Sequence, residues 1–163
     1  MTTDWDALYA RRLQWMSTSV IRDILKVTQS PDIISMAGGW PDAGLFPVDQ
    51  LREVADYVLQ HRTGEALQYG LTEGLPALRE ALAGQTREAG VPAGADNIVI
   101  TSGSQQTLDL MGRILLDEGD TVLVECPTFV GALQSFNAYG VRHAPVPLDD
   151  DGVRVEAIED VLR

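Results

Sequence analysis

The stretch from Ile98 to Leu110 constrains the fold most, because a strand pattern there passes directly into a helix pattern. Residues 98–100 are a run of β-branched side chains, and a Ser-Gly-Ser turn follows at residues 102–104. Apolar residues at helical spacing begin shortly afterwards, at Leu108. We therefore expect a strand, a tight turn and a helix in immediate succession.

The start of this predicted helix has the physical properties of an anion site. The first N–H groups of a helix have no partner within the helix, and the helix dipole adds partial positive charge there. Gly103 allows the backbone to approach a ligand closely, and Ser104 and Gln105 are placed to add side-chain donors. Phosphate is the usual ligand of such a site. The alternative interpretation is that Ser104 only caps a structural helix.

Charge and composition limit the expected partners. The 163 residues include 24 acidic side chains and 12 lysines and arginines, which gives a net charge of −12. This charge argues against nucleic acid and anionic membrane surfaces as partners. No segment approaches the roughly 20 apolar residues of a membrane-spanning helix, and the N-terminus is acidic where a secretory signal is basic. We expect a cytoplasmic protein.

The chain has a single cysteine, Cys126, and therefore no internal disulfide. We interpret Cys126 as a small buried residue at the end of a strand, with a reactive thiol as the alternative. No group of Cys and His residues has the spacing of metal ligands, so no metal site is expected.

The order of the predicted elements indicates an α/β fold. Helical periodicity predicts helices over residues 4–15, 19–28, 49–61, 76–90, 129–138 and 155–162. Short apolar runs predict strands at 121–125 and 141–146 in addition to 98–100, with a polar link at 63–74 and a turn at 149–152. Strands and helices that alternate across links of a few residues are typical of a parallel sheet covered by helices, with right-handed crossovers.

Five separated motifs occur along the chain. They are Ser35–Pro41 with Leu45–Pro47, Leu67–Gly70 with Thr72–Gly74, Thr101–Gln106, Asp117–Asp120, and Glu125–Phe129. In that order and at those spacings they resemble the N-terminal part of fold-type I, pyridoxal-phosphate-dependent aminotransferases, and the resemblance covers nearly all of the chain. The branch that it resembles most is the 2-aminoadipate and kynurenine type, whose catalytic domain some fused bacterial regulators also carry.

The resemblance implies a division of the chain and an incomplete fold. Residues 1–48 would be an N-terminal helical arm with a small-domain segment, and residues 49–163 the first part of the large domain that binds pyridoxal phosphate. The fold class implied is the N-terminal part of the fold-type I transferase fold, with its large domain and parallel sheet incomplete and N-terminal helices before it.

The resemblance also implies the residues that bind the cofactor, pyridoxal 5'-phosphate. Gly103, Ser104 and Gln105 would hold its phosphate, which is the role that the physics of the helix start predicts independently. Phe129 falls where the family usually has a tyrosine lying on the pyridine ring, and a phenyl ring keeps the stacking but loses the hydroxyl. Tyr69 matches a tyrosine that reaches across a dimer to the partner's phosphate, so a homodimer is implied.

The substrates that the resemblance implies are an amino acid and a 2-oxo acid. Gly39 matches a glycine that lies against the substrate, and Arg22 matches an arginine on the N-terminal helix that meets the substrate's side chain. A guanidinium suits a second carboxylate and favours acidic substrates, whereas a structural Arg22 on a solvated face is the alternative. Trp40 stands where a smaller aliphatic residue is common in the family.

The chain departs from the family at the catalytic lysine. Pyridoxal-phosphate chemistry uses a Schiff-base lysine whose amine also moves the α-proton. The one lysine, Lys26, lies on the predicted N-terminal helix, whereas the family's lysine comes far beyond the phosphate loop. We therefore assign no catalytic residue, and we expect a truncated chain, about two-fifths of such an enzyme, that is inactive and marginally stable alone.

Three functions are weighed on these observations. The first is amino transfer from an amino acid to a 2-oxo acid, and the second is a non-catalytic homologue that binds a phosphate ligand or a partner subunit. A fused regulator is disfavoured, because few residues precede the helix predicted at 19–28. The third is a dinucleotide oxidoreductase, but residues 101–106 lack the Gly-x-Gly-x-x-Gly pattern, and Glu125 is only an ambiguous ribose-binding acid.

Overall fold

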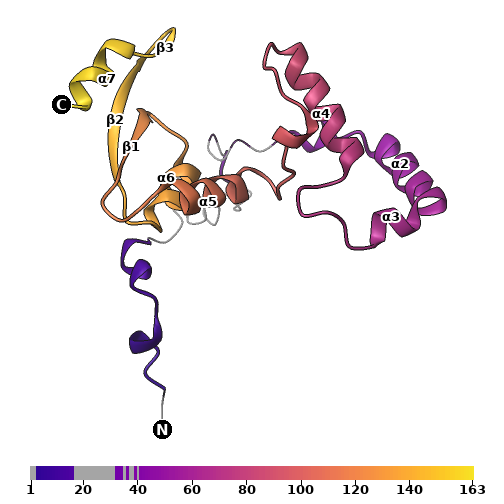
Figure 1. Ribbon diagram of the computed structural model, residues 1–163, viewed down its shortest axis with the longest axis horizontal. Helices are drawn as coiled ribbons and strands as arrows, with labels where there is room; N and C mark the ends of the chain where they lie inside the picture. The colour runs from indigo at the N-terminus through magenta and orange to yellow at the C-terminus, as the bar shows by residue number, and fades with distance from the viewer. Residues whose placement is uncertain (1–2, 17–31, 35, 37–38, 40) are drawn as a thin grey trace. The chain divides into compact units, whose positions relative to one another are not determined.

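The computed structural model describes residues 3–16, 32–34, 36, 39 and 41–163. Its contacts group the chain into two compact units, one formed by Met1–Gly38 with Ser102–Arg163 and the other by Gly39–Thr101. Figure 1 shows the helices and strands of both units. The domain boundary expected at residue 48 separates the arm and small-domain segment from the large domain of the family. The two contact units do not test that boundary, so it stays a prediction.

The first unit contains a small mixed sheet. Strands β1 (Thr121–Cys126) and β2 (Arg142–Asp149) run parallel, with Thr121 opposite Arg142 and Cys126 opposite Pro147. This confirms the expected parallel pair. A short strand, β3 (Gly152–Val153), pairs antiparallel with the end of β2, so the residues expected to form only a turn close a hairpin. The sheet is therefore not purely parallel.

Among the described residues, the same unit also contains the α-helices α5 (Ser104–Leu115), α6 (Val130–Asn137) and α7 (Val155–Val161). Helix α5 packs against α6, and α7 packs against β2. Figure 1 shows α5 and α6 side by side, and α7 next to the upper end of β2. The helices expected at 129–138 and 155–162 and the helix after the Ser-Gly-Ser turn are confirmed, because apolar periodicity and turn residues specify them locally.

The second unit is helical. It contains η3 (Ala43–Leu45), α2 (Val48–His61), α3 (Thr63–Leu67), α4 (Pro76–Glu88) and η4 (Ala95–Asn97). Both long helices were expected, and Pro76 occupies the first turn of α4, where its missing N–H costs nothing. Helix α3 lies in the stretch expected to be a polar link, and an Arg62–Glu65 pair, with Nε to Oε2 at 2.8 Å, supports its first turn.

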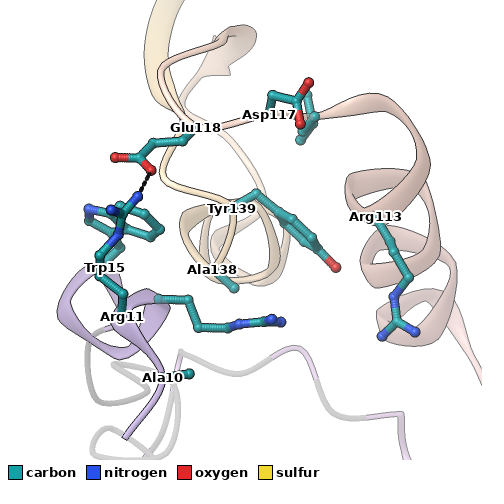
Figure 2. A pocket seen from close by; sticks show the side chains of 10 residues that line it. Ala10, Arg11, Trp15, Arg113, Asp117, Glu118, Ala138 and Tyr139 are labelled. Carbon is teal, nitrogen blue, oxygen red and sulfur yellow. Dashed lines mark hydrogen bonds and ion pairs between the residues drawn. The ribbon is translucent and has the colours of Figure 1, made fainter.

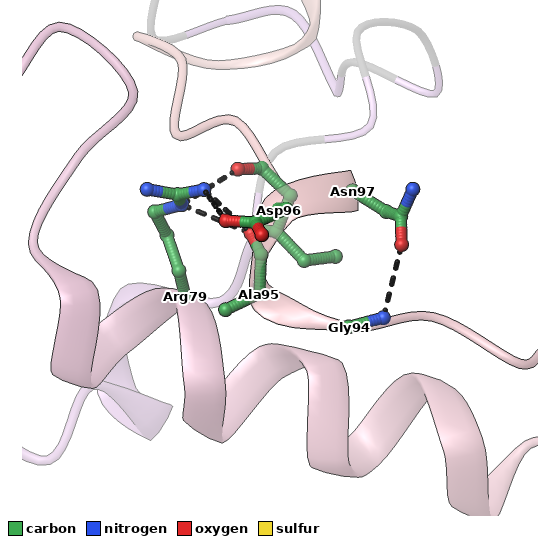
Figure 3. A network of polar contacts seen from close by, with 6 residues as sticks. Arg79, Gly94, Ala95, Asp96 and Asn97 are labelled. Carbon is green, nitrogen blue, oxygen red and sulfur yellow. Dashed lines mark hydrogen bonds and ion pairs between the residues drawn. The ribbon is translucent and has the colours of Figure 1, made fainter.

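The strand expected at residues 98–100 is wrong. Ile98 has extended backbone angles, φ −111° and ψ 128°, but the segment joins no ladder with any described strand. Instead, Ile100 N–H donates to Glu73 O at 2.9 Å, and the Ile100 side chain lies against the space where Gly74 lacks a Cβ. Arg79 donates to Ile98 O at 2.9 Å and to Ala95 O at 2.7 Å (Figure 3). These contacts hold the segment extended without a strand partner.

The N-terminal arm also differs from the expectation. The single α-helix expected over residues 4–15 is replaced by two 3₁₀ helices, η1 (Asp6–Leu8) and η2 (Arg11–Trp15), neither of which contains a buried residue. A short helix without a packed apolar face gains little from α-helical geometry. The helix expected at 19–28 lies outside the described residues.

Few side chains in the described residues are buried. Ala83, at 0% exposure, and Val146, at 2%, are the buried apolar residues there. The apolar stripe that predicts α2 as amphipathic is largely exposed, with Leu51 at 60%, Val54 at 59% and Leu59 at 52%. The apolar side of α2 is therefore largely uncovered by the described residues. Within the described part of the chain, no helix combines the length and the apolar character needed to cross a membrane.

The expectation that Cys126 is buried is wrong. It is the last residue of β1 and is exposed. Along β1 the half-buried residues are Val122 and Val124, so burial follows the strand's two-residue alternation and ends before Cys126. Periodicity alone does not reveal where the covering elements stop.

Candidate functional site

The turn before α5 has the backbone geometry of the expected anion site. Gly103 is the N-cap residue, with φ +78° and ψ 175°, a conformation that residues with a side chain avoid. Apart from the adjacent residues of the chain, no atom of the described residues lies within 4 Å of the position that a Cβ on Gly103 would occupy. Helix α5 has 12 residues, and no side chain makes its capping hydrogen bond. The backbone at this turn therefore has the conformation that lets a chain pass close to a ligand.

Ser104 is the first residue of α5 and not its cap, so the alternative that it only caps a structural helix is wrong. The turn is held from inside the helix instead, because Ser102 N–H donates to the side-chain oxygen of Gln106 at 2.5 Å. Gln106 is not among the site residues predicted from the sequence. A Gln at the third helical position commonly accepts a hydrogen bond from a backbone N–H at the start of its own helix, and here the donor is the residue before the N-cap.

The side chain of Gln105 is turned toward α6. Its amide nitrogen donates to the hydroxyl of Ser135 and lies 3.5 Å from Gly131 O. The expected side-chain donation from Gln105 to an anion is therefore not the arrangement present. Gln105 contributes to the helix start through its backbone, and its role in cofactor binding stays a prediction.

Phe129 lies close to Gln105 in space. It is the N-cap residue of α6, and its side chain is 57% exposed. A Cβ on Gly131 would come within 2.5 Å of the Phe129 ring and 3.2 Å of the side-chain oxygen of Gln105. Glycine at position 131 thus permits this close approach. The structure brings Gln105 and Phe129 together, with Gly103 and Ser104 just before Gln105 in the chain.

The other expected site residues lie elsewhere. Tyr69 and Gly39 belong to the second unit, where Tyr69 is 99% exposed and Gly39 has φ +55° with open space at its Cβ position. Arg22 lies outside the described residues, as do Lys26 and Trp40. The roles expected of Tyr69, Gly39 and Arg22 therefore stay predictions.

A separate cavity of about 670 Å³ lies between the N-terminal arm and the ends of α5 and α6. Figure 2 shows Arg11 paired with Glu118 on one side and Arg113 on the other. Arg113 pairs with Asp109 at 3.0 Å, and its hydrogen bond to the Tyr139 oxygen, followed by the charge of Asp109, raises the pKa of Arg113 above its ordinary value. These two guanidinium groups are engaged by acidic side chains, and the lining contains none of the expected site residues.

Among the described residues, no group of three or more His, Cys, Asp and Glu side chains is placed to hold a metal ion. The chemistry of the helix start is instead that of a backbone cradle for an oxyanion. The ring of Phe129 lies near the side chain of Gln105, and its role in binding the cofactor stays a prediction.

Comparison of the sequence with known proteins identifies its family. Residues 33–163 match the family aminotransferase class I and II. Aromatic-amino-acid aminotransferase 1 of Thermococcus litoralis is 41% identical over 163 residues, which cover 99% of this chain and 39% of that protein. The 2-aminoadipate transaminase of Thermus thermophilus is 39% identical over 159 residues, with coverages of 98% and 39%. The chain belongs to the class I and II aminotransferase family.

Solved structures confirm the fold. The α-aminoadipate aminotransferase of Thermus thermophilus, complexed with N-(5'-phosphopyridoxyl)-L-leucine, is 38% identical with a TM-score of 0.83, over 98% of this chain and 39% of that one. An archaeal alanine:glyoxylate aminotransferase gives 35% identity and a TM-score of 0.89, over 98% and 41%. The chain thus spans about two-fifths of the length of these relatives. Family and ligand together point to pyridoxal phosphate as the cofactor.

Proposed function

We propose that the chain forms the phosphate-binding and ring-binding part of a pyridoxal-phosphate-dependent aminotransferase, which moves an amino group from an amino acid to a 2-oxo acid. The observation that carries the proposal is the left-handed Gly103 at the start of the 12-residue helix α5, with the ring of Phe129 close to Gln105. The family supports an enzyme over a non-catalytic homologue that would use the same cradle.

Each part of this site has a physical role. The backbone N–H groups at the start of α5, from Ser104 and Gln105, bind the phosphate, and the positive end of the helix dipole favours its negative charge. The Ser104 hydroxyl, at an exposed first helical position, adds a donor. The Phe129 ring packs on one face of the pyridine. The bound cofactor supplies an electron sink for bond breaking at the α-carbon of the amino acid.

The substrate side and the dimer belong to the same proposal. Tyr69 is almost fully exposed, as a residue must be if it binds the phosphate held by a second copy of the chain. Gly39 would lie against the substrate, and Arg22 would bind a second carboxylate of an acidic substrate. The family's amine-bearing lysine has no counterpart among the described residues. A cytoplasmic location stays a prediction.

The proposal is tested with a pair of ligands that differ only in the phosphate. Pyridoxine and pyridoxine 5'-phosphate carry no aldehyde, so neither reacts with amines of the protein. In calorimetric titrations we expect the phosphate ester to bind about tenfold more tightly or better, because charge-assisted hydrogen bonds are worth about 1.5–3 kcal/mol each. Ser104→Ala should weaken binding of the ester alone, whereas Phe129→Leu should weaken binding of both ligands.

A matched pair of glycine variants supplies the control. Gly103→Ala forces a side chain into a strained backbone conformation at the cradle and should remove the preference for the phosphate ester. Gly119→Ala places the same kind of strain in another turn of the first unit, where φ is +94°, and should leave the preference unchanged. Equal affinity of the unaltered chain for pyridoxine and its phosphate would contradict the proposal, as would equal effects of the two glycine variants.

A further inference from the structure

Ser135 is the buried polar side chain of the described structure, with 7% of the residue exposed. It lies on the face of α6 that meets α5, and its hydroxyl donates to Gly131 O, one helical turn earlier, at 3.1 Å. A serine hydroxyl has one proton, so its lone pairs remain for an incoming donor. The amide nitrogen of Gln105 provides that donor. The direction of both hydrogen bonds is thereby fixed.

This arrangement determines where the side chain of Gln105 points. Its nitrogen faces α6, and its oxygen lies 3.2 Å from the Cβ position of Gly131, which the ring of Phe129 also approaches. A side chain held in this way does not wrap around a phosphate at the start of α5. The backbone of Gln105 thus forms part of the helix start, whereas its side chain forms a hydrogen bond with α6.

The pair joins the two halves of the proposed cofactor site. Gln105 is in the first turn of α5, where the phosphate would bind, and Ser135 is in the helix that begins directly after Phe129. We propose that Ser135 is a positioning residue that acts through Gln105 to set the separation between the start of α5 and the ring of Phe129. This inference rests on the proposed function. In this arrangement Ser135 acts without contacting the phosphate or the pyridine ring of the cofactor.

The consequence is a selective effect on ligands that span both halves. A ligand with both a phosphate and an aromatic ring depends on the separation between the cradle and Phe129, whereas inorganic phosphate uses the cradle alone. Loss of the Gln105–Ser135 hydrogen bond should therefore weaken the first kind of ligand and spare the second. A general loosening of the unit would weaken both.

The test titrates the 163-residue chain with inorganic phosphate, pyridoxine and pyridoxine 5'-phosphate. Ser135→Ala should weaken binding of the phosphate ester about three- to tenfold, the range expected for one hydrogen bond, with inorganic phosphate unaffected. Gln105→Met, which removes the amide from the exposed partner and keeps a good helix former, should give the same pattern. The double variant should bind no more weakly than Gln105→Met, because both changes remove one interaction.

Thr86→Ala is the matched control, since Thr86 makes the same bond from a hydroxyl to the carbonyl four residues earlier, to Leu82 O at 2.8 Å in α4. It should change none of the three affinities. The inference is overturned by unchanged ester binding in Ser135→Ala, by equal losses for all three ligands, or by additive losses in the double variant. If Ser135→Ala does not fold, Gln105→Met alone decides by the same criterion. Failure of the proposed function appears separately, as no phosphate preference in the unaltered chain.

Discussion

The ring of Tyr139 lies against Gly112 so closely that a Cβ on Gly112 would come within 2.5 Å of the ring carbon Cε2. Gly112 is buried near the C-terminal end of α5, and Tyr139 follows the end of α6. The missing side chain at position 112 therefore allows the two helices that carry the candidate site to meet. The contact lies at the opposite end of α5 from Gly103.

This contact predicts opposite outcomes for two Gly→Ala substitutions within helices. Gly112→Ala should destabilise α5 and α6 by about 1–3 kcal/mol, because the added methyl overpacks a filled contact. Gly84→Ala in α4 should stabilise its helix by up to about 1 kcal/mol, because the nearest atom, on the flexible Arg87 side chain, is 3.9 Å away. Amide hydrogen exchange in each helix measures both effects. Equal effects of the two substitutions would contradict this assignment.

The hydroxyl of Tyr139 should contribute separately from its ring. It donates to Asp109 Oδ1 at 2.8 Å and approaches Asp109 O at 3.0 Å. Tyr139→Phe keeps the packing on Gly112 and should cost about 1 kcal/mol, the typical value for a lost hydrogen bond. Chemical denaturation of the two proteins measures the difference, and Tyr9→Phe, at an exposed position of the arm, serves as the control. A loss above about 3 kcal/mol would indicate that the ring has also moved.

Arg79 and Asp96 form an ion pair whose two members should differ greatly in importance. The Arg79 side chain is 12% exposed and donates to the carbonyl oxygens of Ala95 and Ile98 (Figure 3). Arg79→Met should destabilise the segment by about 2 kcal/mol or more, because those carbonyls lose a charged donor. The Asp96 side chain is fully exposed (104%), and its Oδ1 lies 3.4 Å from Arg79 Nη2. Asp96→Asn should therefore have no measurable effect. Amide exchange at residues 95–98 distinguishes the two variants.

The pKa of Glu156 should lie below the ordinary value of 4.5. The largest cause is a hydrogen bond from the backbone N–H of Glu156 itself, at the start of α7. The second cause is Arg154, whose Nε donates to Glu156 Oε1 at 2.9 Å. Because the folded state holds the carboxylate ionised, this contribution to stability is present above about pH 4.5 and is lost as the pH falls through the lowered pKa.

The checking measurement is an NMR titration of the Glu156 carboxyl. Arg154→Ala should raise its pKa only part of the way to 4.5, since the backbone bond remains. Arg163→Ala removes an arginine that pairs with Glu159 and Asp160 instead, and should leave the pKa of Glu156 where it was. A complete return to 4.5 in Arg154→Ala would show that the backbone bond has no part in the shift.

Most elements of the fold follow from local patterns. The periodicity over 49–61 and 76–90 predicts α2 and α4, and the apolar runs at 121–125 and 141–146 predict β1 and β2. These patterns act over a few residues at a time, so they are visible without knowledge of what packs on them. The segment at 98–100 has the same kind of pattern but forms no strand, because a strand also needs a partner.

The candidate site divides in the same way. The sequence by itself determined that a glycine turn precedes a helix at residues 103–104, because a turn depends on a few consecutive residues. It also determined the family, because the order and spacing of the motifs are properties of the linear chain. Only the tertiary structure decided that Gln105 turns its amide to Ser135, 30 residues away, and that Phe129 lies over Gly131. Side-chain direction depends on which distant partner offers a matching acceptor or an empty space, and no local pattern carries that information.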